Sequence, residues 1–163
     1  MLEPGDSAPE FTLPGVHLDR STEIETFELG DTLASSPVLL NFYVFDFNPA
    51  CRENVCDLHD LAWFDLDREI GVFGISADGA FSHREFASQE GLEYPLLSDS
   101  DGSVAAAYGV AYDEFRGHKN VARRAVFVVD ETGTVRYSWS ADDPTDQPEW
   151  DAIKAAIDDL KTT

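Results

Sequence analysis

One stretch decides the fold: residues 38–56 read VLLNFYVFDFNPACRENVC. Its first part, Val38–Phe45, is a largely apolar run of strand length, as expected for a central strand that is covered on both faces. Asn is a favoured helix N-cap and Pro is pre-shaped for the first helical position, so Asn48 and Pro49 predict a helix directly after the strand. A buried strand that leads straight into a helix is typical of an α/β domain.

The two cysteines of the chain, Cys51 and Cys56, both lie in this predicted helix. Cys51 falls in its first turn, near the positive end of the helix dipole, and Arg52 adds a neighbouring cation. Both features favour the thiolate form of a cysteine, which is the nucleophilic form. Cys51 is therefore the candidate nucleophile.

The spacing of the cysteines argues against a structural disulfide. Five positions along a helix place the thiols of Cys51 and Cys56 about 140° and 7.5 Å apart, which is too far for a bond while the helix is intact. A pair that can bond only after the first turns unwind indicates a catalytic relay, in which Cys56 attacks an oxidised Cys51. For Cys56 the alternative of a small side chain packed in the core stays open.

Length and composition predict a single domain over residues 1–163, large enough to bury a core. The sequence shows no basic segment followed by an apolar stretch at its start and no run of membrane-spanning length. Two cysteines with this spacing do not form a disulfide scaffold, which fits a reducing compartment. We therefore expect a soluble, cytoplasmic protein with no membrane partner.

The charge balance is strongly acidic, with 32 Asp and Glu against 11 Lys and Arg and a formal net charge of −21. Such a surface repels nucleic acid, which is therefore excluded as a partner. The acids are scattered among apolar periodicities, so we interpret them as the solvated face of a folded domain. About 1 M salt would screen most of their mutual repulsion, and the composition resembles that of proteins from salt-in halophiles.

The remaining elements alternate between strands and helices. Further strands are predicted at Ile70–Ser76, Ala125–Asp130 and Thr134–Trp139, the last with one wet face, and helices at Phe81–Gln89, Gly102–Tyr108 and Trp150–Leu160. Residues 1–29 should supply an edge hairpin, and Tyr94–Leu97 a short extended piece. This order predicts an α/β fold with a mixed central sheet and helices on both faces, and it resembles an extended thioredoxin-like fold.

The predicted helix that begins at Pro49 and contains Cys51 and Cys56 is called the cysteine helix below. Helical spacing also predicts which of its faces is buried and which is exposed. Its predicted core stripe consists of Val55, Leu58, Ala62 and Leu66, and its predicted wet face of Glu53, Asp57, Asp60 and Asp67. The three other histidines outside this helix, His17, His83 and His118, show no partner pattern for acid–base catalysis and are expected at the surface.

Several stretches together resemble the peroxiredoxins, and among them the bacterioferritin co-migratory type, over nearly the whole chain. The matching stretches are Gly5–Pro14, Asn41–Asp60, Gly74–Asp78 with Phe81–His83, Tyr94–Asp99, Ala107–Val110 and Arg124–Asp130. The resemblance implies that Cys51 is the peroxidatic cysteine, that Cys56 is the resolving cysteine, and that Arg124 stabilises the thiolate and orients the peroxide. A guanidinium is permanently charged and offers donors in a fixed geometry, which suits that role.

Three positions differ from the family pattern. The family has Pro where this chain has Val44, Thr or Ser where it has Asn48, and Glu or Gln where it has Asn54. Val44 can still shield the thiolate from water, although it lacks the fixed backbone of proline. Asn48 can donate a hydrogen bond through its amide where Thr would use a hydroxyl, although capping competes for the same side chain.

The resulting hypothesis is a thiol peroxidase that reduces hydrogen peroxide or organic hydroperoxides, needs no cofactor, and is recycled by a thioredoxin-like or other dithiol protein. The sequence leaves open a monomer or a homodimer. One alternative is a thiol-disulfide oxidoreductase acting on protein disulfides, although these enzymes usually carry Cys-x-x-Cys, which this chain lacks. A second alternative is a metal-binding module built from Cys51, Cys56 and His59, for which no fourth ligand is evident.

Overall fold

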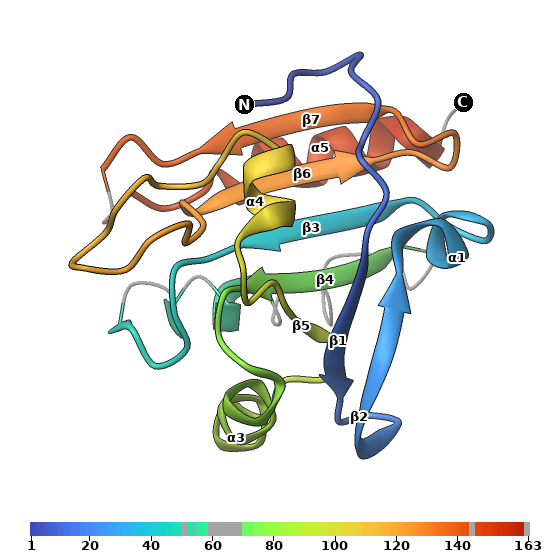
Figure 1. The fold of residues 1–163 in the computed structure, drawn as a ribbon. Helices are drawn as coiled ribbons and strands as arrows, with labels where there is room; N and C mark the ends of the chain where they lie inside the picture. The colour runs from blue at the N-terminus through green and yellow to red at the C-terminus, as the bar shows by residue number, and fades with distance from the viewer. Residues whose placement is uncertain (50–51, 54, 59–69, 144–145, 162–163) are drawn as a thin grey trace.

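A computed structural model describes residues 1–49, 52–53, 55–58, 70–143 and 146–161 of the chain. Within these residues the backbone forms a seven-stranded sheet with the strand order β2-β1-β5-β4-β3-β6-β7 (Figure 1). The strands are β1 Thr12–His17, β2 Ser21–Glu28, β3 Val38–Phe42, β4 Gly71–Ser76, β5 Leu96–Ser98, β6 Ala125–Val129 and β7 Val135–Ser140. The helices are α1 Leu29–Leu33, α3 Ala80–Glu90, α4 Ser103–Ala107 and α5 Trp150–Lys161.

The sheet is mixed. Strand β3 pairs in parallel with β4, and β4 in parallel with β5, whereas β6 runs antiparallel to β3. The hairpin β1–β2 adds antiparallel to β5, and β7 adds antiparallel to β6. The predicted edge hairpin near the N-terminus is therefore confirmed, with β2 as the outer strand.

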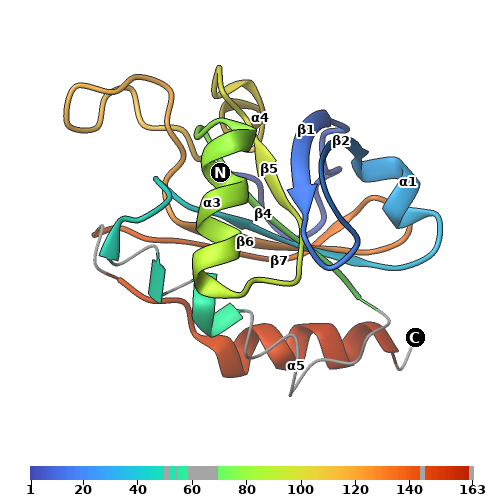
Figure 2. The ribbon, with the colours of Figure 1, turned by 90° about the horizontal axis from the view of Figure 1, so that it is seen from below.

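Helices cover both faces of this sheet. On one face α3 and α5 pack with Val55 and Leu58 of the cysteine helix, and on the other face α1 and α4 pack beneath the N-terminal segment. Figure 2 shows α5 on one side of the sheet and α1 and α4 on the other. The observed architecture confirms the predicted α/β fold with a mixed sheet.

Strand β3 is buried along its whole length, as the apolar run predicted. It is shorter than the run itself, because the chain leaves the ladder after Phe42 and turns toward the cysteine helix. Helix α3 ends at Gly91, whose φ of 66° is the left-handed conformation that closes a helix, as expected from the sequence.

The prediction for β7 is wrong in one respect. We expected one buried and one wet face, but after Val135 its residues are exposed only at Arg136 and half-buried from Tyr137 onward. Helix α5 packs against this strand, and the N-terminal segment continues the sheet beside its first residue, where Gly5 N–H donates to Val135 O at 2.8 Å. Cover from two sides removes the simple alternation.

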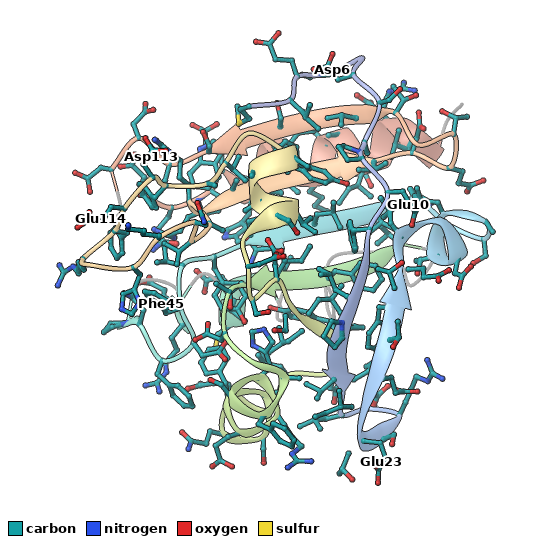
Figure 3. The ribbon with its side chains drawn as sticks, in the orientation of Figure 1. Asp6, Glu10, Glu23, Phe45, Asp113 and Glu114 are labelled. Carbon is teal, nitrogen blue, oxygen red and sulfur yellow. The ribbon has the colours of Figure 1, made fainter. Side chains whose placement is uncertain are left out.

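The acidic surface has the predicted character. Asp6, Glu10, Glu23, Asp113 and Glu114 are exposed and come from separate segments of the chain (Figure 3). Among the described residues, no helix combines the length and the apolar character that crossing a membrane requires.

Candidate active site

The site lies at one end of the central strands. Phe42, the last residue of β3, pairs with Ile75 of β4 and with Ala125 of β6. The chain therefore leaves β3 toward the cysteine helix at the same sheet end at which Arg124 enters β6. Residues that are far apart in the sequence meet there because β3 and β6 are neighbouring antiparallel strands.

The start of the cysteine helix has the predicted form in its described part. Arg52 N–H donates to Asn48 O at 2.7 Å, the bond that an N-cap carbonyl accepts in the first helical turn. Val55 and Leu58 are 0% exposed, whereas Glu53 and Asp57 face water, which confirms this part of the predicted faces. Cys51, Asn54 and residues 59–69, which include His59, lie outside the described residues.

The turn before this helix is sharp. Phe47 adopts a φ of 67°, a left-handed conformation that bulky residues seldom take. Its ring packs edge-on against Phe86 of α3 with centroids 5.1 Å apart, and the guanidinium of Arg52 lies 5.9 Å from its centre. Phe45 of the same turn contacts the ring of His118 at 4.7 Å, and Figure 3 shows Phe45 below the loop that carries Asp113 and Glu114.

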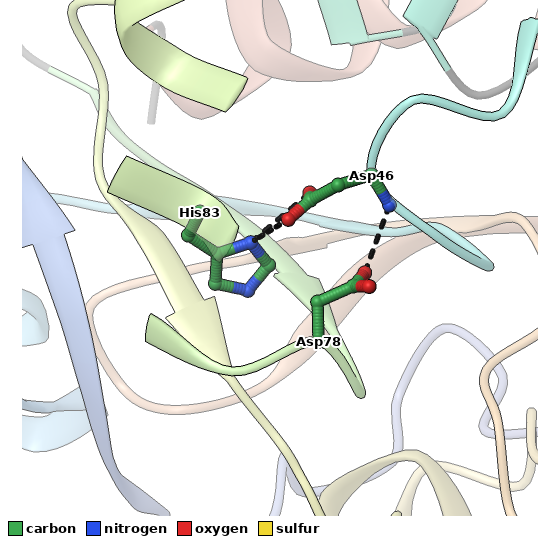
Figure 4. Close-up of side chains that lie close together, drawn as sticks. All are labelled: Asp46, Asp78 and His83. Atoms are coloured by element: carbon green, nitrogen blue, oxygen red, sulfur yellow. Dashed lines mark hydrogen bonds and ion pairs between the residues drawn. The ribbon is translucent and has the colours of Figure 1, made fainter. Parts of the chain in front are cut away.

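A polar network with a buried Asp46–His83 pair at its centre fixes this turn to the start of α3. Asp46 Oδ2 lies 2.8 Å from His83 Nδ1, and the side chains of both residues are 0% exposed (Figure 4). Tyr43 donates to Asp46 Oδ1 at 2.7 Å, and Ser82 donates to Asp46 Oδ2 at 2.8 Å. The carboxylate of Asp46 is thus held by three side chains from two segments.

The position of His83 contradicts the expectation of a surface residue. His83 belongs to the buried stripe of α3 with Phe86 and Ala87, at the spacing of three and four residues that marks one helix face. Its Nε2 lies 2.9 Å from Leu97 O, and because a carbonyl only accepts, this nitrogen carries a hydrogen. The other nitrogen, Nδ1, faces Asp46, and a proton between this nitrogen and the carboxyl oxygen makes the two groups a buried hydrogen-bonded pair.

Burial tunes the groups around this pair. Burial, reinforced by Asp46, raises the pKa of Tyr43 well above its ordinary value, so Tyr43 remains a donor to Asp46. Burial also raises the pKa of Asp78, again with Asp46 as the next cause. Asp78 Oδ2 accepts from the Asp46 N–H at 2.8 Å and from the Ser76 hydroxyl at 2.5 Å, which ties the turn to the end of β4.

Asp46, Asp78 and His83 are also the candidate cation ligands among the described residues, because one donor atom of each lies within 4.8 Å of the others. All three are already engaged in hydrogen bonds within the protein. These bonds account for the arrangement without an ion, so we interpret the group as a structural network.

Cys56 of the cysteine helix contacts the C-terminal end of α3. It is a reduced, half-buried cysteine, and its Sγ donates to Glu90 Oε2 at 3.5 Å. The other oxygen of Glu90 lies 2.6 Å from Arg52 Nε. Glu90 therefore joins two residues of the cysteine helix, and it is a functional candidate that the sequence analysis missed.

Tyr94, in the loop before β5, binds the cysteine helix. Its hydroxyl donates to Val55 O at 2.9 Å in a buried position. Burial raises the pKa of Tyr94 well above its ordinary value, with smaller contributions from Cys56 and Asp46. The phenol is therefore a permanent donor to this carbonyl.

Arg124 is 1% exposed, so it is a buried cation at the sheet end and not a surface charge at a strand start. One terminal nitrogen donates to Asp146 O, and the other donates to Gln147 Oε1 at 2.8 Å. Arg123, by contrast, turns away and lies over the ring of Tyr112 at 4.8 Å. The sequence preference for Arg124 over Arg123 thus corresponds to a clear difference in environment.

The structure places Arg124 directly before β6, beside the end of β3, and Asn48 at the start of the cysteine helix. Cys56 lies further along that helix, next to Glu90, and the position of Cys51 lies outside the described residues. Sequence reasoning missed Asp46, His83, Glu90 and Gln147. A signal existed for two of them, because His83 lies three and four residues before Phe86 and Ala87 on one face of α3, and Glu90 follows His83 by seven residues at the half-buried end of that face. For Gln147 the sequence offers no such periodicity.

Comparison with known proteins gives a consistent result. A model of the AhpC/TSA family matches residues 4–138. A protein of Coxiella burnetii assigned as a bcp peroxiredoxin is 36% identical over 141 residues, which cover 85% of this chain and 88% of that protein. Alkyl hydroperoxide reductase E of Mycobacterium bovis is 34% identical over 141 residues, covering 85% of both chains.

The fold has the same relatives. The crystal structure of peroxidoxin BcpB from Mycobacterium tuberculosis superposes with a TM-score of 0.82 at 29% identity, and the alignment covers 98% of this chain and 99% of that one. The match extends over the sheet and both helical layers and therefore also confirms the thioredoxin-like class of the fold.

Proposed function

Because the chain belongs to the AhpC/TSA family and is a peroxiredoxin-type thiol peroxidase, we propose that Cys51 is its peroxidatic cysteine and Cys56 its resolving cysteine. The proposed substrates are hydrogen peroxide and organic hydroperoxides. The proposed cycle closes through an intramolecular disulfide.

The cycle has three balanced steps. The Cys51 thiolate attacks one peroxide oxygen, the O–O bond breaks, and the leaving oxygen departs as water or an alcohol after taking up a proton, which leaves a sulfenic acid on Cys51. The Cys56 sulfur then attacks the sulfenic sulfur, and a disulfide and water form. A dithiol protein finally reduces this disulfide and is itself oxidised to a disulfide.

The observation that carries the proposal is the buried cation at the sheet end. Arg124 is almost fully excluded from water. It lies at the sheet end at which the chain leaves β3 and continues to the helix that contains Cys51 in the sequence. A cation in such surroundings attracts an anionic thiolate more strongly than an exposed one would. Two of its nitrogen atoms hold the connector at Asp146 and Gln147, which fixes the plane of the guanidinium.

Two further residues complete the proposed site. Val44 is 2% exposed, which suits a dry wall beside the thiolate. Asn48 is half-buried at the start of the helix, where its side-chain amide can donate to a bound peroxide while its backbone carbonyl accepts from the Arg52 N–H. We propose that Asn48 supplies the donor for which other members of the family use a hydroxyl.

We further propose that residues 1–163 act as one domain, because a single sheet and two cores run through the described chain. The reductant is proposed to be a thioredoxin-like or other dithiol protein, met in a reducing compartment such as the cytoplasm, since the cycle consumes dithiols. A monomer or a homodimer satisfies this mechanism.

Two serine variants test the assignment of the cysteines. Cys51→Ser should abolish peroxide consumption, because it removes the nucleophile. Cys56→Ser should consume about one equivalent and stop with sulfenic or more oxidised Cys51, because resolution is blocked. Stopped-flow peroxide consumption and the mass of the oxidised protein measure both outcomes, and equal loss of the first step in the two variants would refute the assignment.

The role of Arg124 has a matched control in its neighbour. Arg124→Lys keeps the charge but loses the planar set of donors, and should slow the oxidation of Cys51 by about 10-fold to 100-fold. Arg123→Lys, beside it in the sequence but stacked on Tyr112, should leave that rate unchanged. Equal rates in the two variants would remove Arg124 from the proposed site.

A further inference from the structure

Glu90 makes two contacts with the cysteine helix that differ in kind. With Oε1 it forms an ion pair with Arg52 at 2.6 Å, and with Oε2 it accepts the Cys56 thiol at 3.5 Å. The side chain of Glu90 is 21% exposed, so water reaches the carboxylate only in part. A single carboxylate at the end of α3 thus contacts both the neighbour of the candidate nucleophile and the second cysteine.

This carboxylate disfavours the reactive form of Cys56. A hydrogen bond from Sγ to a carboxylate requires the thiol to keep its proton, and a thiolate there would place two negative charges side by side. The thiolate is the form that attacks sulfenic acids and disulfides. In the contact with Glu90, Cys56 is therefore held as an unreactive thiol.

Leaving this contact is a condition for the bond with Cys51. Two cysteines five residues apart in a helix cannot form a disulfide unless helical turns open. Helix α3 cannot follow the moving cysteine, because its buried face is fixed by His83, Phe86 and Ala87. The distance between Cys56 and Glu90 must therefore increase whenever Cys56 moves out of its helical place.

We propose that Glu90 is a positioning residue that holds the resolving cysteine Cys56 in its resting place and thereby slows disulfide closure. This inference rests on the proposed function for its catalytic consequence, although the hold on Cys56 itself does not. Glu90 then sets the time for which oxidised Cys51 waits as a sulfenic acid.

That waiting time decides between two products. If Cys56 arrives first, its sulfur displaces the hydroxyl of the sulfenic acid, and a disulfide and water form. If a second peroxide arrives first, one of its oxygens is transferred to the sulfenic sulfur, the O–O bond breaks, and a sulfinic acid forms together with water or an alcohol. A stronger hold on Cys56 thus shifts the enzyme toward sulfinic acid at high peroxide concentration.

The hold can be measured without any peroxide chemistry. In the Cys51→Ser background Cys56 is the remaining thiol, and its alkylation by iodoacetamide reports how often it is both released and ionised. Adding Glu90→Gln should raise the alkylation rate by about threefold to tenfold, because the negative charge that disfavours the thiolate of Cys56 is removed.

Two controls separate a hold on the thiol from a general loosening of the helix. Glu85→Gln removes one exposed charge from the same helix α3 and should leave the alkylation rate unchanged. Arg52→Gln breaks the ion pair but keeps the carboxylate beside Cys56, and should not raise the rate. No response to Glu90→Gln, or an equal rise with Arg52→Gln, would overturn the proposal.

The same substitution in the chain with both cysteines tests the catalytic consequence. Glu90→Gln should speed disulfide closure after a peroxide pulse by a similar factor and lower the fraction of sulfinic Cys51, which mass spectrometry of the 18.0 kDa chain resolves. Faster alkylation with unchanged closure would refute the effect of Glu90 on resolution. If no variant forms a disulfide although alkylation responds, the proposed function fails while the hold of Glu90 on Cys56 stands.

Discussion

Helix α3 holds the chain that follows β3 at two places, one in the turn and one in the cysteine helix, and the two attachments differ in burial. At its start, His83 binds Asp46 in the turn after β3, with both side chains 0% exposed. At its end, Glu90 binds Arg52, with side chains 21% and 43% exposed. One helix therefore fixes the turn firmly and the cysteine helix loosely.

Dielectric surroundings explain the difference. A hydrogen-bonded pair without water is expensive to break from one side, since the remaining partner stays buried with its polar atom unsatisfied. An ion pair in contact with water is screened, and its partners exchange bonds with solvent at little cost. In the proposed cycle the cysteine helix opens once, and its ion pair with Glu90 can break for this at little cost while the turn stays fixed.

The largest expected effect tests the firm attachment. Asp46→Ala takes away the shared hydrogen-bond partner of His83, Tyr43 and Ser82. At about 1–3 kcal/mol for each buried group left unsatisfied, the free energy of unfolding should fall by about 3–5 kcal/mol. Urea unfolding of the reduced protein measures the loss. Asp57→Ala, an exposed acid of the cysteine helix, should stay within about 0.5 kcal/mol of the parent protein.

The next prediction separates local from global electrostatics. With a net charge of −21, the whole chain should become more stable as KCl rises from millimolar to molar concentration, because screening reduces the repulsion of exposed acids. The loss caused by Asp46→Ala should stay constant over the same series, because salt does not screen a pair without solvent. Thermal melts over the KCl series follow the parent protein and the Asp46→Ala variant. If salt changed the stability of the two proteins by different amounts, the pair would be open to solvent and not buried.

The loose attachment should matter little for stability. Arg52→Ala removes the ion pair with Glu90 and should lower the free energy of unfolding by less than about 1 kcal/mol, with a smaller loss at high salt. The comparison of the two ends of α3 would fail if this loss matched that of Asp46→Ala in the same urea titration.

The smallest expected effect concerns pH. Burial, helped by Asp46, raises the pKa of Asp78 above its ordinary value of 3.8, so the folded state binds this proton more tightly than the unfolded state does. The stability that this proton contributes is complete below the unfolded pKa and is lost as the pH rises through the folded pKa. Asp78→Asn, which stays uncharged, should therefore be more stable than the parent at neutral pH, by less than about 1 kcal/mol.

The advantage of Asp78→Asn should shrink as the pH falls toward 3.8, where the parent carboxyl also takes up its proton. Urea titrations at several pH values between neutral and acidic conditions measure the difference. If the gain in the free energy of unfolding stayed constant with pH, its cause would be a change in the hydrogen bond with Ser76 and not the removal of a charge.

Local signals in the sequence predicted most of the fold. The apolar run that became β3, the Asn48–Pro49 helix start and the Gly91 stop each act within a few residues, so propensity and capping suffice to locate them. The β7 edge could not be predicted in this way, because its cover comes from the N-terminal segment and α5, which are distant in sequence.

For the candidate site, too, local sequence signals indicate some residues, whereas others depend on contacts between distant segments. Arg124 and Cys56 are predicted as site residues from motif and spacing, and the structure adds the burial of the first and a partner of the second. The partnership of Asp46 with His83 spans 37 residues and joins a turn to a helix, so no periodicity within one element reveals it. A histidine without a local partner pattern was expected at the surface, and the buried stripe of α3 was the evidence against it.

Hydrogen exchange before and after one equivalent of hydrogen peroxide tests most directly whether the cysteine helix opens on a fixed turn. In the oxidised protein the amides of residues 52–58 should lose protection, while those of β4 and the first turn of α3, around His83, should keep it. If protection persists through residues 52–58 although the disulfide has formed, or if it is lost equally around His83, then the two ends of α3 do not play the separate roles assigned to them.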